Sequence, residues 1–281
     1  ICTAQANETA GHNAGKKIYA QELVDQAIVH NPGVLVLMMH VTPPGKSENV
    51  VVASNIGRIG KKGDEDDLEV IRSGKPKLEV NKTGDHFEVE LPLQDLSQRT
   101  IGALGVVFPY KKGEDQQAFA RKATAIRDQM RRRITTAASL MDPADWDTTV
   151  PKNTYAQQLV DRALANHPDI LILAMHVTPP KKDKNVILAS NIGRIGKVAD
   201  EDDLDVINTG KPKLEVNSAG DRFEDELGLE DSSGKRIGAL GVVYAYHNGV
   251  DKVALQKKAE QVRDELRKQI PSVDRLCEKA R

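Results

Sequence analysis

The sequence predicts an α+β protein built from two tandem domains, each an antiparallel sheet of about five strands flanked by helices. The chain of 281 residues has the length of two domains of ordinary size. A shift of 136 residues superposes the chain on itself without a gap from Tyr19 to Ile134. Within each copy, strands follow one another through short turns, which is typical of antiparallel sheets packed against helices.

The internal duplication fixes the domain organisation. The octapeptide SNIGRIGK at 54–61 recurs unchanged at 190–197, and IGALGVV at 101–107 recurs at 237–243. A period of 136 residues is the size of a domain and far exceeds the unit of a solenoid. The sequence therefore divides into an N-terminal tail, a first domain, a linker, a second domain and a C-terminal tail, at 1–18, 19–140, 141–151, 152–272 and 273–281. The only tryptophan, Trp146, lies in the linker, where we expect it to pack at the seam between the domains.

The first half of one copy alternates between helical and strand patterns. Residues 21–30 form an amphipathic pattern that Asn-Pro ends, which predicts a helix. The aliphatic run at 34–41 predicts a central strand, and 50–54 predicts a second one. The glycine-containing segment 55–61 predicts a loop. Acidic residues at the start of 64–72 and a glycine just after it predict a short helix.

The second half of the copy is mostly strand. The segments 77–81 and 86–93 predict two strands, joined by a Thr-Gly-Asp hairpin turn. A third strand is expected at 100–110, after another turn. The apolar residues of 115–134 recur on one side of a long helix. Together with the first half, this order predicts one helix-flanked antiparallel sheet for each copy.

Two stretches of each copy resemble Cache domains, which are PAS-like extracytoplasmic sensors. In the first copy they read VVVASNIGRIGKKGDEDDLEVI and FEVELPLQDLSQRTIGALGVVF; in the second they read VILASNIGRIGKVADEDDLDVI and FEDELGLEDSSGKRIGALGVVY. They are similar to the Cache pattern of a strand ending in Ala-Ser, a glycine-containing loop, an acidic short helix and a final strand beginning Ile-Gly. The resemblance covers nearly all of each repeat.

The resemblance implies a fold and a function class. It implies two tandem PAS-like domains, each binding a small metabolite between its sheet and its loop–helix segment. It also implies a periplasmic or secreted protein. The membrane anchors and cytoplasmic output domains of most Cache receptors are not seen in this sequence, since no run approaches the 18–20 apolar residues that span a bilayer. We therefore expect a non-catalytic, sensor-like protein that binds a small carboxylate or amino-acid-like ligand.

Three pairs of repeated residues are candidates for the polar groups of such pockets. His40 and His176 interrupt an aliphatic strand, where a histidine serves a ligand or is simply a buried, hydrogen-bonded side chain. Arg58 and Arg194 lie between two glycines, placed either to bind a carboxylate or to pair with the acidic short helix. Tyr110 and Tyr246 end the final strand of each copy, where a phenol either binds a ligand or packs at the rim.

Several other functions are disfavoured by the residues. The chain has 40 basic and 41 acidic residues, without the basic excess of a nucleic-acid-binding protein. It has no nucleophile elbow, phosphate loop or cysteine beside a candidate base, so we expect no enzyme and no cofactor. No two histidines have the spacing of a helical zinc motif, so we expect no metal site either.

The two cysteines lie outside the repeats, at Cys2 and Cys277. In an extracytoplasmic protein they are candidates for a disulfide, formed within one chain or between neighbouring chains. Lipidation of Cys2 is a third option. Bonds between chains suggest a rival function, that of a self-assembling structural subunit, filamentous or of another homo-oligomeric form, whose termini link neighbouring copies.

Overall fold

The computed structural model describes residues 17–280. Domain 1 comprises the elements from the first repeat: α1 (Tyr19–His30), β1 (Val36–Val41), β2 (Val50–Ser54), α2 (Glu65–Ser73), β3 (Lys77–Val80), β4 (His86–Gln94), β5 (Thr100–Pro109), α3 (Gln116–Arg131) and the 3-10 helix η1 (Ala138–Met141). Domain 2 comprises those from the second: α4 (Tyr155–Asn166), β6 (Ile170–Val177), β7 (Val186–Ser190), α5 (Glu201–Thr209), β8 (Lys213–Val216), β9 (Arg222–Glu230), β10 (Arg236–Ala245), α6 (Lys252–Arg267) and α7 (Val273–Cys277).

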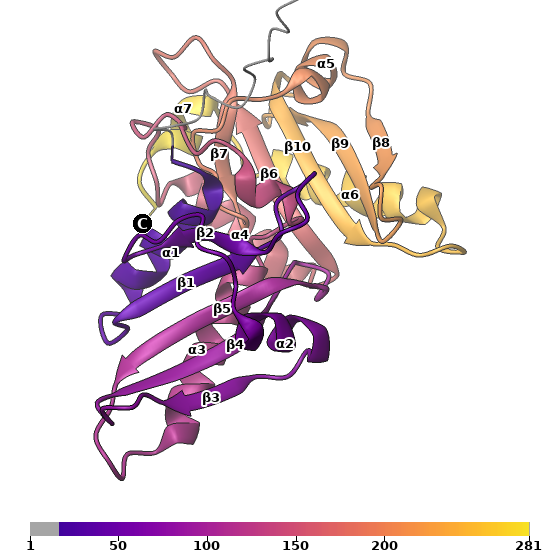
Figure 1. The fold of residues 1–281 in the computed structure, drawn as a ribbon. Helices are drawn as coiled ribbons and strands as arrows, with labels where there is room; N and C mark the ends of the chain where they lie inside the picture. The colour runs from indigo at the N-terminus through magenta and orange to yellow at the C-terminus, as the bar shows by residue number, and fades with distance from the viewer. Residues whose placement is uncertain (1–16, 281) are drawn as a thin grey trace, which may run out of the picture.

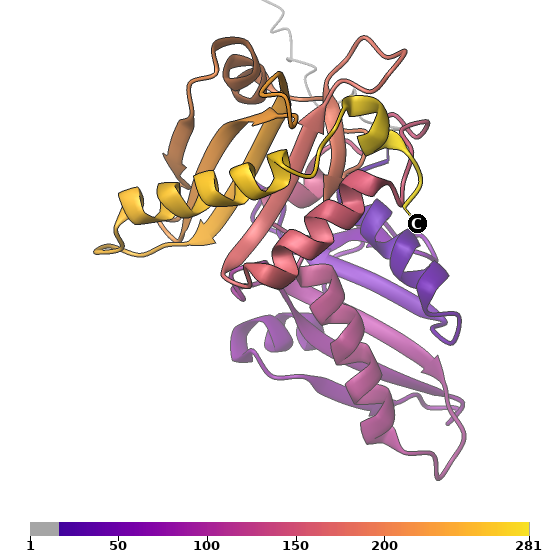
Figure 2. The same ribbon diagram turned by 180° about the vertical axis from the view of Figure 1, so that it is seen from behind.

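Each domain is a PAS-like antiparallel sheet of five strands, as the sequence predicts. The strand order is β2-β1-β5-β4-β3 in domain 1 and β7-β6-β10-β9-β8 in domain 2. The long helices α1 and α3 cover one face of the first sheet, and α4 and α6 cover the same face of the second (Figures 1 and 2). The short helices α2 and α5 lie over the opposite faces. The apolar cores fill the space between each sheet and its long helices.

The short helices are fixed by their own acidic residues. In α5, the side chain of Asp200 accepts hydrogen bonds from the first turn, and Asp203 returns one to the backbone of Asp200, which forms a capping box. Asp64 and Asp67 do the same for α2. Because a capping-box residue has little freedom, Asp67 and Asp203 are held on the buried side of their helices, where they face the sheet.

The two copies of the octapeptide SNIGRIGK have different environments. In domain 2 the copy at 190–197 is covered by domain 1: Tyr19 donates a hydrogen bond to the carbonyl of Ile192 (2.9 Å), and Arg133 donates to the same carbonyl (3.3 Å). Ile192 is 8% exposed, in a small apolar cluster with Leu96 of domain 1. In domain 1 the equivalent Ile56 is 43% exposed. Identical sequence is thus buried in one copy and open in the other.

The linker and the C-terminal segment both pack. The ring of Trp146 lies 5.6 Å from the ring of Tyr19 and borders a cavity that also includes Gln157 and Leu188 of domain 2, which confirms its expected place at the seam. The segment 273–281, expected to be a tail, contains α7, which packs against α4 through the buried Leu276. Across the described residues, no helix combines the length and apolar character needed to cross a bilayer.

Candidate functional site

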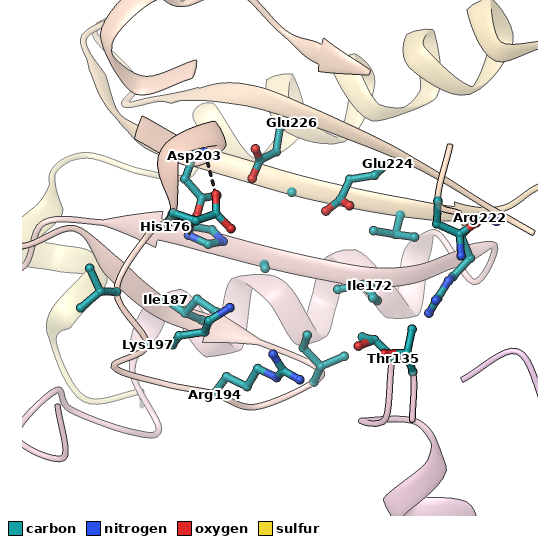
Figure 3. A pocket seen from close by; sticks show the side chains of 18 residues that line it. Thr135, Ile172, His176, Ile187, Arg194, Lys197, Asp203, Arg222, Glu224 and Glu226 are labelled. Atoms are coloured by element: carbon teal, nitrogen blue, oxygen red, sulfur yellow. Dashed lines mark hydrogen bonds and ion pairs between the residues drawn. The ribbon is translucent and has the colours of Figure 1, made fainter. Parts of the chain in front are cut away.

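The largest cavity lies in domain 2, between the sheet and α5, and has a volume of about 270 Å³ (Figure 3). Its floor is the sheet face opposite the long helices, and its sides are α5 and the loop 190–197. Domain 1 closes one side with Thr135 and Thr136, which follow α3. The apolar part of the wall consists of Ile172, Ala174, Ile187, Ile192 and Val243. A site that both domains build depends on how they are docked.

The period of the strands places charged residues on this floor. Alternate residues of a strand point to the same face, so Arg222, Glu224 and Glu226 of β9 all line the cavity. His176 of β6 lines it for the same reason. Gly241 of β10 lies between these strands, and a side chain there would meet both glutamates at 3.8 Å. The glycine therefore leaves the floor open.

One end of the cavity is acidic. The side chains of His176, Asp203 and Glu226 converge there (Figure 3). The Nδ1 atom of His176 lies 3.1 Å from the Oδ2 atom of Asp203, although the orientation does not make a hydrogen bond. All three residues are buried, and one donor atom from each lies within 4.8 Å of the other two. Three ionisable groups are thus enclosed in a space of a few ångströms.

The buried carboxyl groups do not share the same charge state. Burial, and then the hydrogen bond with the negative Asp203, raise the pKa of Glu226 to about 10. Burial opposes ionisation of Asp203 too, but the adjacent His176 and Glu226 outweigh it and hold the pKa of Asp203 well below its usual range. Burial also raises the pKa of Glu224. At neutral pH, Glu226 therefore carries a proton and Asp203 is ionised.

The other part of the cavity is basic, with Arg194, Lys197 and Arg222 in its wall. Arg194 is only 6% exposed. Its Nη1 atom pairs with Asp142 at 3.0 Å, and its guanidinium lies over the ring of Tyr19, 4.3 Å from the centroid. Its Nε and Nη2 atoms have no hydrogen-bond partner in the described part of the chain. Since a buried guanidinium normally has its donors satisfied, these two atoms are available to an anionic group.

The equivalent cavity of domain 1 is smaller, about 190 Å³, and is lined almost wholly by charged residues. Met38 stands where domain 2 has Ala174, and the longer side chain fills part of the space. His40, Asp67 and Glu90 repeat the acidic end, with 3.3 Å between His40 and Asp67. Burial and then Asp67 raise the pKa of Glu90 to about 9, while burial lowers the pKa of His40 despite Asp67.

No family model and no curated protein sequence matches the chain. Solved structures with a similar arrangement include the inducer-binding domain of the PobR transcription factor from Acinetobacter, at 14% identity over 43% of this chain and 99% of that one, with a TM-score of 0.28. PelD from Pseudomonas aeruginosa matches at 14% identity over 92% and 80%, with a TM-score of 0.30. The periplasmic domain of RsbU from Chlamydia trachomatis matches at 8% identity over 85% and 78%, with a TM-score of 0.26.

Four of the six residues proposed from the sequence border these cavities. His176 and Arg194 line the cavity of domain 2, and His40 and Arg58 line that of domain 1. Neither arginine pairs with the acidic short helix within residues 17–280: Arg194 pairs with Asp142, and Arg58 is exposed.

The two tyrosines lie elsewhere. The ring of Tyr110 is 5.8 Å from that of Phe87, and the ring of Tyr246 is 6.3 Å from that of Phe223. Both therefore extend the apolar core on the helix-covered face, away from the cavities. The end of the final strand carries its side chains past the edge of the floor.

The sequence analysis missed the acidic groups, Asp203 and Glu226 with Glu224, and their counterparts in domain 1. A signal was present in the second-copy segment FEDEL, because two glutamates two residues apart point to one face of a strand that is otherwise buried. The cysteines leave their pairing open. Cys277 is a half-buried thiol whose pKa burial raises to about 11, and Cys2 lies outside the described residues.

Proposed function

We propose that this protein is a non-catalytic, extracytoplasmic sensor of the Cache type, whose second domain binds a small carboxylate or amino-acid-like ligand. The observation that carries the proposal is the buried Arg194, which keeps two free guanidinium nitrogens beside a cavity with an acidic opposite end. A carboxylate fits the first group, and an ammonium fits the second. The volume of about 270 Å³ suits a ligand smaller than the drug-sized molecules that fill about 300–1,000 Å³.

Domain 2 rather than domain 1 is the proposed binding domain. Its cavity combines an apolar wall with a few charged groups, the usual composition of a small-molecule site. The cavity of domain 1 has little apolar wall, and its Arg58 is exposed to water, which weakens any ion pair that it makes. Domain 1 then serves as a support that closes the site in domain 2 through Thr135 and Thr136.

The test is a thermal-shift screen of amino acids and small carboxylates, followed by calorimetry with Arg222→His. This substitution introduces the residue that domain 1 has at the equivalent position, His86, so the fold accommodates it. We expect a ligand that stabilises the wild type to bind at least tenfold more weakly to the variant, since a buried charge facing the cavity is lost. Arg236→His, at an exposed arginine of the same domain, should bind normally. No stabilisation by any compound of these classes would refute the proposal.

Self-assembly is a second candidate, favoured by the exposed octapeptide of domain 1. Ile59 is 59% exposed, whereas its counterpart Ile195 is packed against the core of domain 2. A second copy of the chain is the partner that would cover this loop. An open head-to-tail chain is blocked, because Arg275 of α7 lies over Tyr155 at 4.4 Å, the position that Arg194 takes over Tyr19. The remaining arrangement is a symmetric dimer in which two copies of loop 54–61 meet.

Sedimentation of the wild type and of the double variant Ile56→Ser, Ile59→Ser tests this candidate. A dimer that reductant leaves intact and that the double variant abolishes would support it, because the two exposed isoleucines would then be the buried contact. A wild-type chain that stays monomeric at 100 μM, a concentration at which about 1 μM affinity gives mostly dimer, would exclude it.

A further inference from the structure

We propose that His176, Asp203 and Glu226 bind a divalent transition-metal ion, with Zn²⁺ as the ion of choice. The three residues come from β6, α5 and β9, and one donor atom from each lies within 4.8 Å of the other two. Geometry alone then gives a point no more than about 2.8 Å from all three atoms, close to the 2.0–2.2 Å of zinc–nitrogen and zinc–oxygen bonds. One imidazole and two carboxylates form a donor set that zinc accepts.

The second observation is the imidazole itself. His176 is 8% exposed, and its Nδ1 atom makes no hydrogen bond with any described residue. Yet that atom lies 3.1 Å from Asp203, close enough for a hydrogen bond that its orientation does not form. Two ligands of one zinc ion lie about 3–3.5 Å apart without bonding to each other, which is the arrangement seen here. A buried polar atom left without a hydrogen bond is unfavourable unless another group satisfies it.

The position of the cluster gives an ion access and a cause to bind. The cluster opens into the cavity rather than into the apolar core, as Figure 3 shows. Asp203 is anchored by the capping box of α5, and the two strands hold the other ligands, so little conformational entropy is lost on binding. Without an ion, the proton on Glu226 relieves the repulsion between the carboxyl groups, and a divalent cation would take its place.

Domain 1 repeats the same three residue types at His40, Asp67 and Glu90, with the same unbonded Nδ1 atom. Here His40 and Asp67 are 3.3 Å apart, and the three donor atoms do not converge as closely as in domain 2. The inference therefore concerns domain 2, and any binding in domain 1 is expected to be weaker.

The experiment measures Zn²⁺ retained after dialysis of the untagged, chelator-stripped chain against 1 μM free ZnCl₂, with no organic ligand present. We expect Glu226→Gln and His176→Asn each to reduce the bound zinc by one ion per chain, and to weaken the affinity at least tenfold. His167→Asn, which alters a histidine paired with Glu265 outside both cavities, should retain the wild-type amount.

Glutamine mimics the protonated Glu226, so this variant is expected to fold even if His176→Asn does not. Absence of retained zinc in the wild type would overturn the inference, as would wild-type retention by Glu226→Gln. Because the probe is zinc alone, either result is separate from the ligand test with Arg222→His, and one proposal can fail without the other.

Discussion

Replacing Asp225 by valine is expected to stabilise the protein by about 3 kcal/mol at pH 7. Asp225 lies on β9 but on the face opposite the cavity, where it is fully buried beneath α6. Neither of its carboxylate oxygens has a hydrogen-bond partner within the described residues. Domain 1 has Val89 at the equivalent position, also fully buried. The duplicated fold thus shows that valine fits this site, whereas an unpartnered carboxyl group costs several kcal/mol when buried.

The size of the effect should depend on pH. Burial, and then the nearby Glu260, raise the pKa of Asp225 from 3.8 to about 7, while Arg263 lowers it. Because the folded pKa lies above the unfolded one, the folded state binds the extra proton between about pH 4 and pH 7, and stability falls as pH rises through this window. A shift of about three pKa units corresponds to about 4 kcal/mol at full ionisation. The advantage of the variant should be small at pH 4 and reach its maximum above pH 7.

Urea denaturation at pH 4.5 and pH 8 measures this dependence, and domain 1 supplies the reciprocal variant. Val89→Asp places the same carboxyl group into the equivalent apolar site, so it should destabilise domain 1 by about 3 kcal/mol or more at pH 8. A gain from Asp225→Val that is equal at both pH values would show that ionisation of Asp225 is not the cause. A loss of stability would show that the carboxyl group has a favourable role in the folded protein.

The duplication explains why so much of the fold could be predicted from one sequence. Each strand and helix of the core was written twice, so a pattern seen in one copy could be checked in the other. The predicted helix at 64–72 corresponds to α2 (Glu65–Ser73), because its acidic first turn and following glycine are local signals. The helix α7 was missed because its stability depends on contacts with α4, such as the burial of Leu276, that no local pattern shows.

The candidate site was harder to predict, for a reason that Arg58 and Arg194 illustrate. Both lie in the same octapeptide, so the sequence gives them one interpretation. Their difference arises only when domain 1 packs against loop 190–197 and buries one of them. The acidic end has the same origin: His176, Asp203 and Glu226 are 27 and 23 residues apart along the chain, and the sheet and α5 bring them together. Local spacing cannot show a site that tertiary packing assembles.

Replacing Arg194 by alanine is expected to destabilise the protein by about 2–3 kcal/mol, whereas Arg58→Ala should change stability by less than about 0.5 kcal/mol. The Arg194 side chain is buried between the domains, where it pairs with Asp142 and lies over Tyr19. A desolvated cation–π contact contributes up to about 2 kcal/mol, and the ion pair adds to it although Asp142 is partly exposed. Arg58 is exposed and lacks both contacts within the described structure, so its removal costs little.

Arg194→Lys separates the two contributions that alanine removes together. Lysine keeps the positive charge and can reach a carboxylate, but it lacks the planar guanidinium that lies flat over the ring of Tyr19. If stacking contributes most of the stability, chemical denaturation should place this variant near the alanine variant; if the ion pair does, it should lie near the wild type. Equal effects of the alanine substitution at 194 and at 58 would mean that the domains do not pack in solution through loop 190–197. Because domain 1 also closes the cavity, ligand affinity should fall in step with this loss of packing.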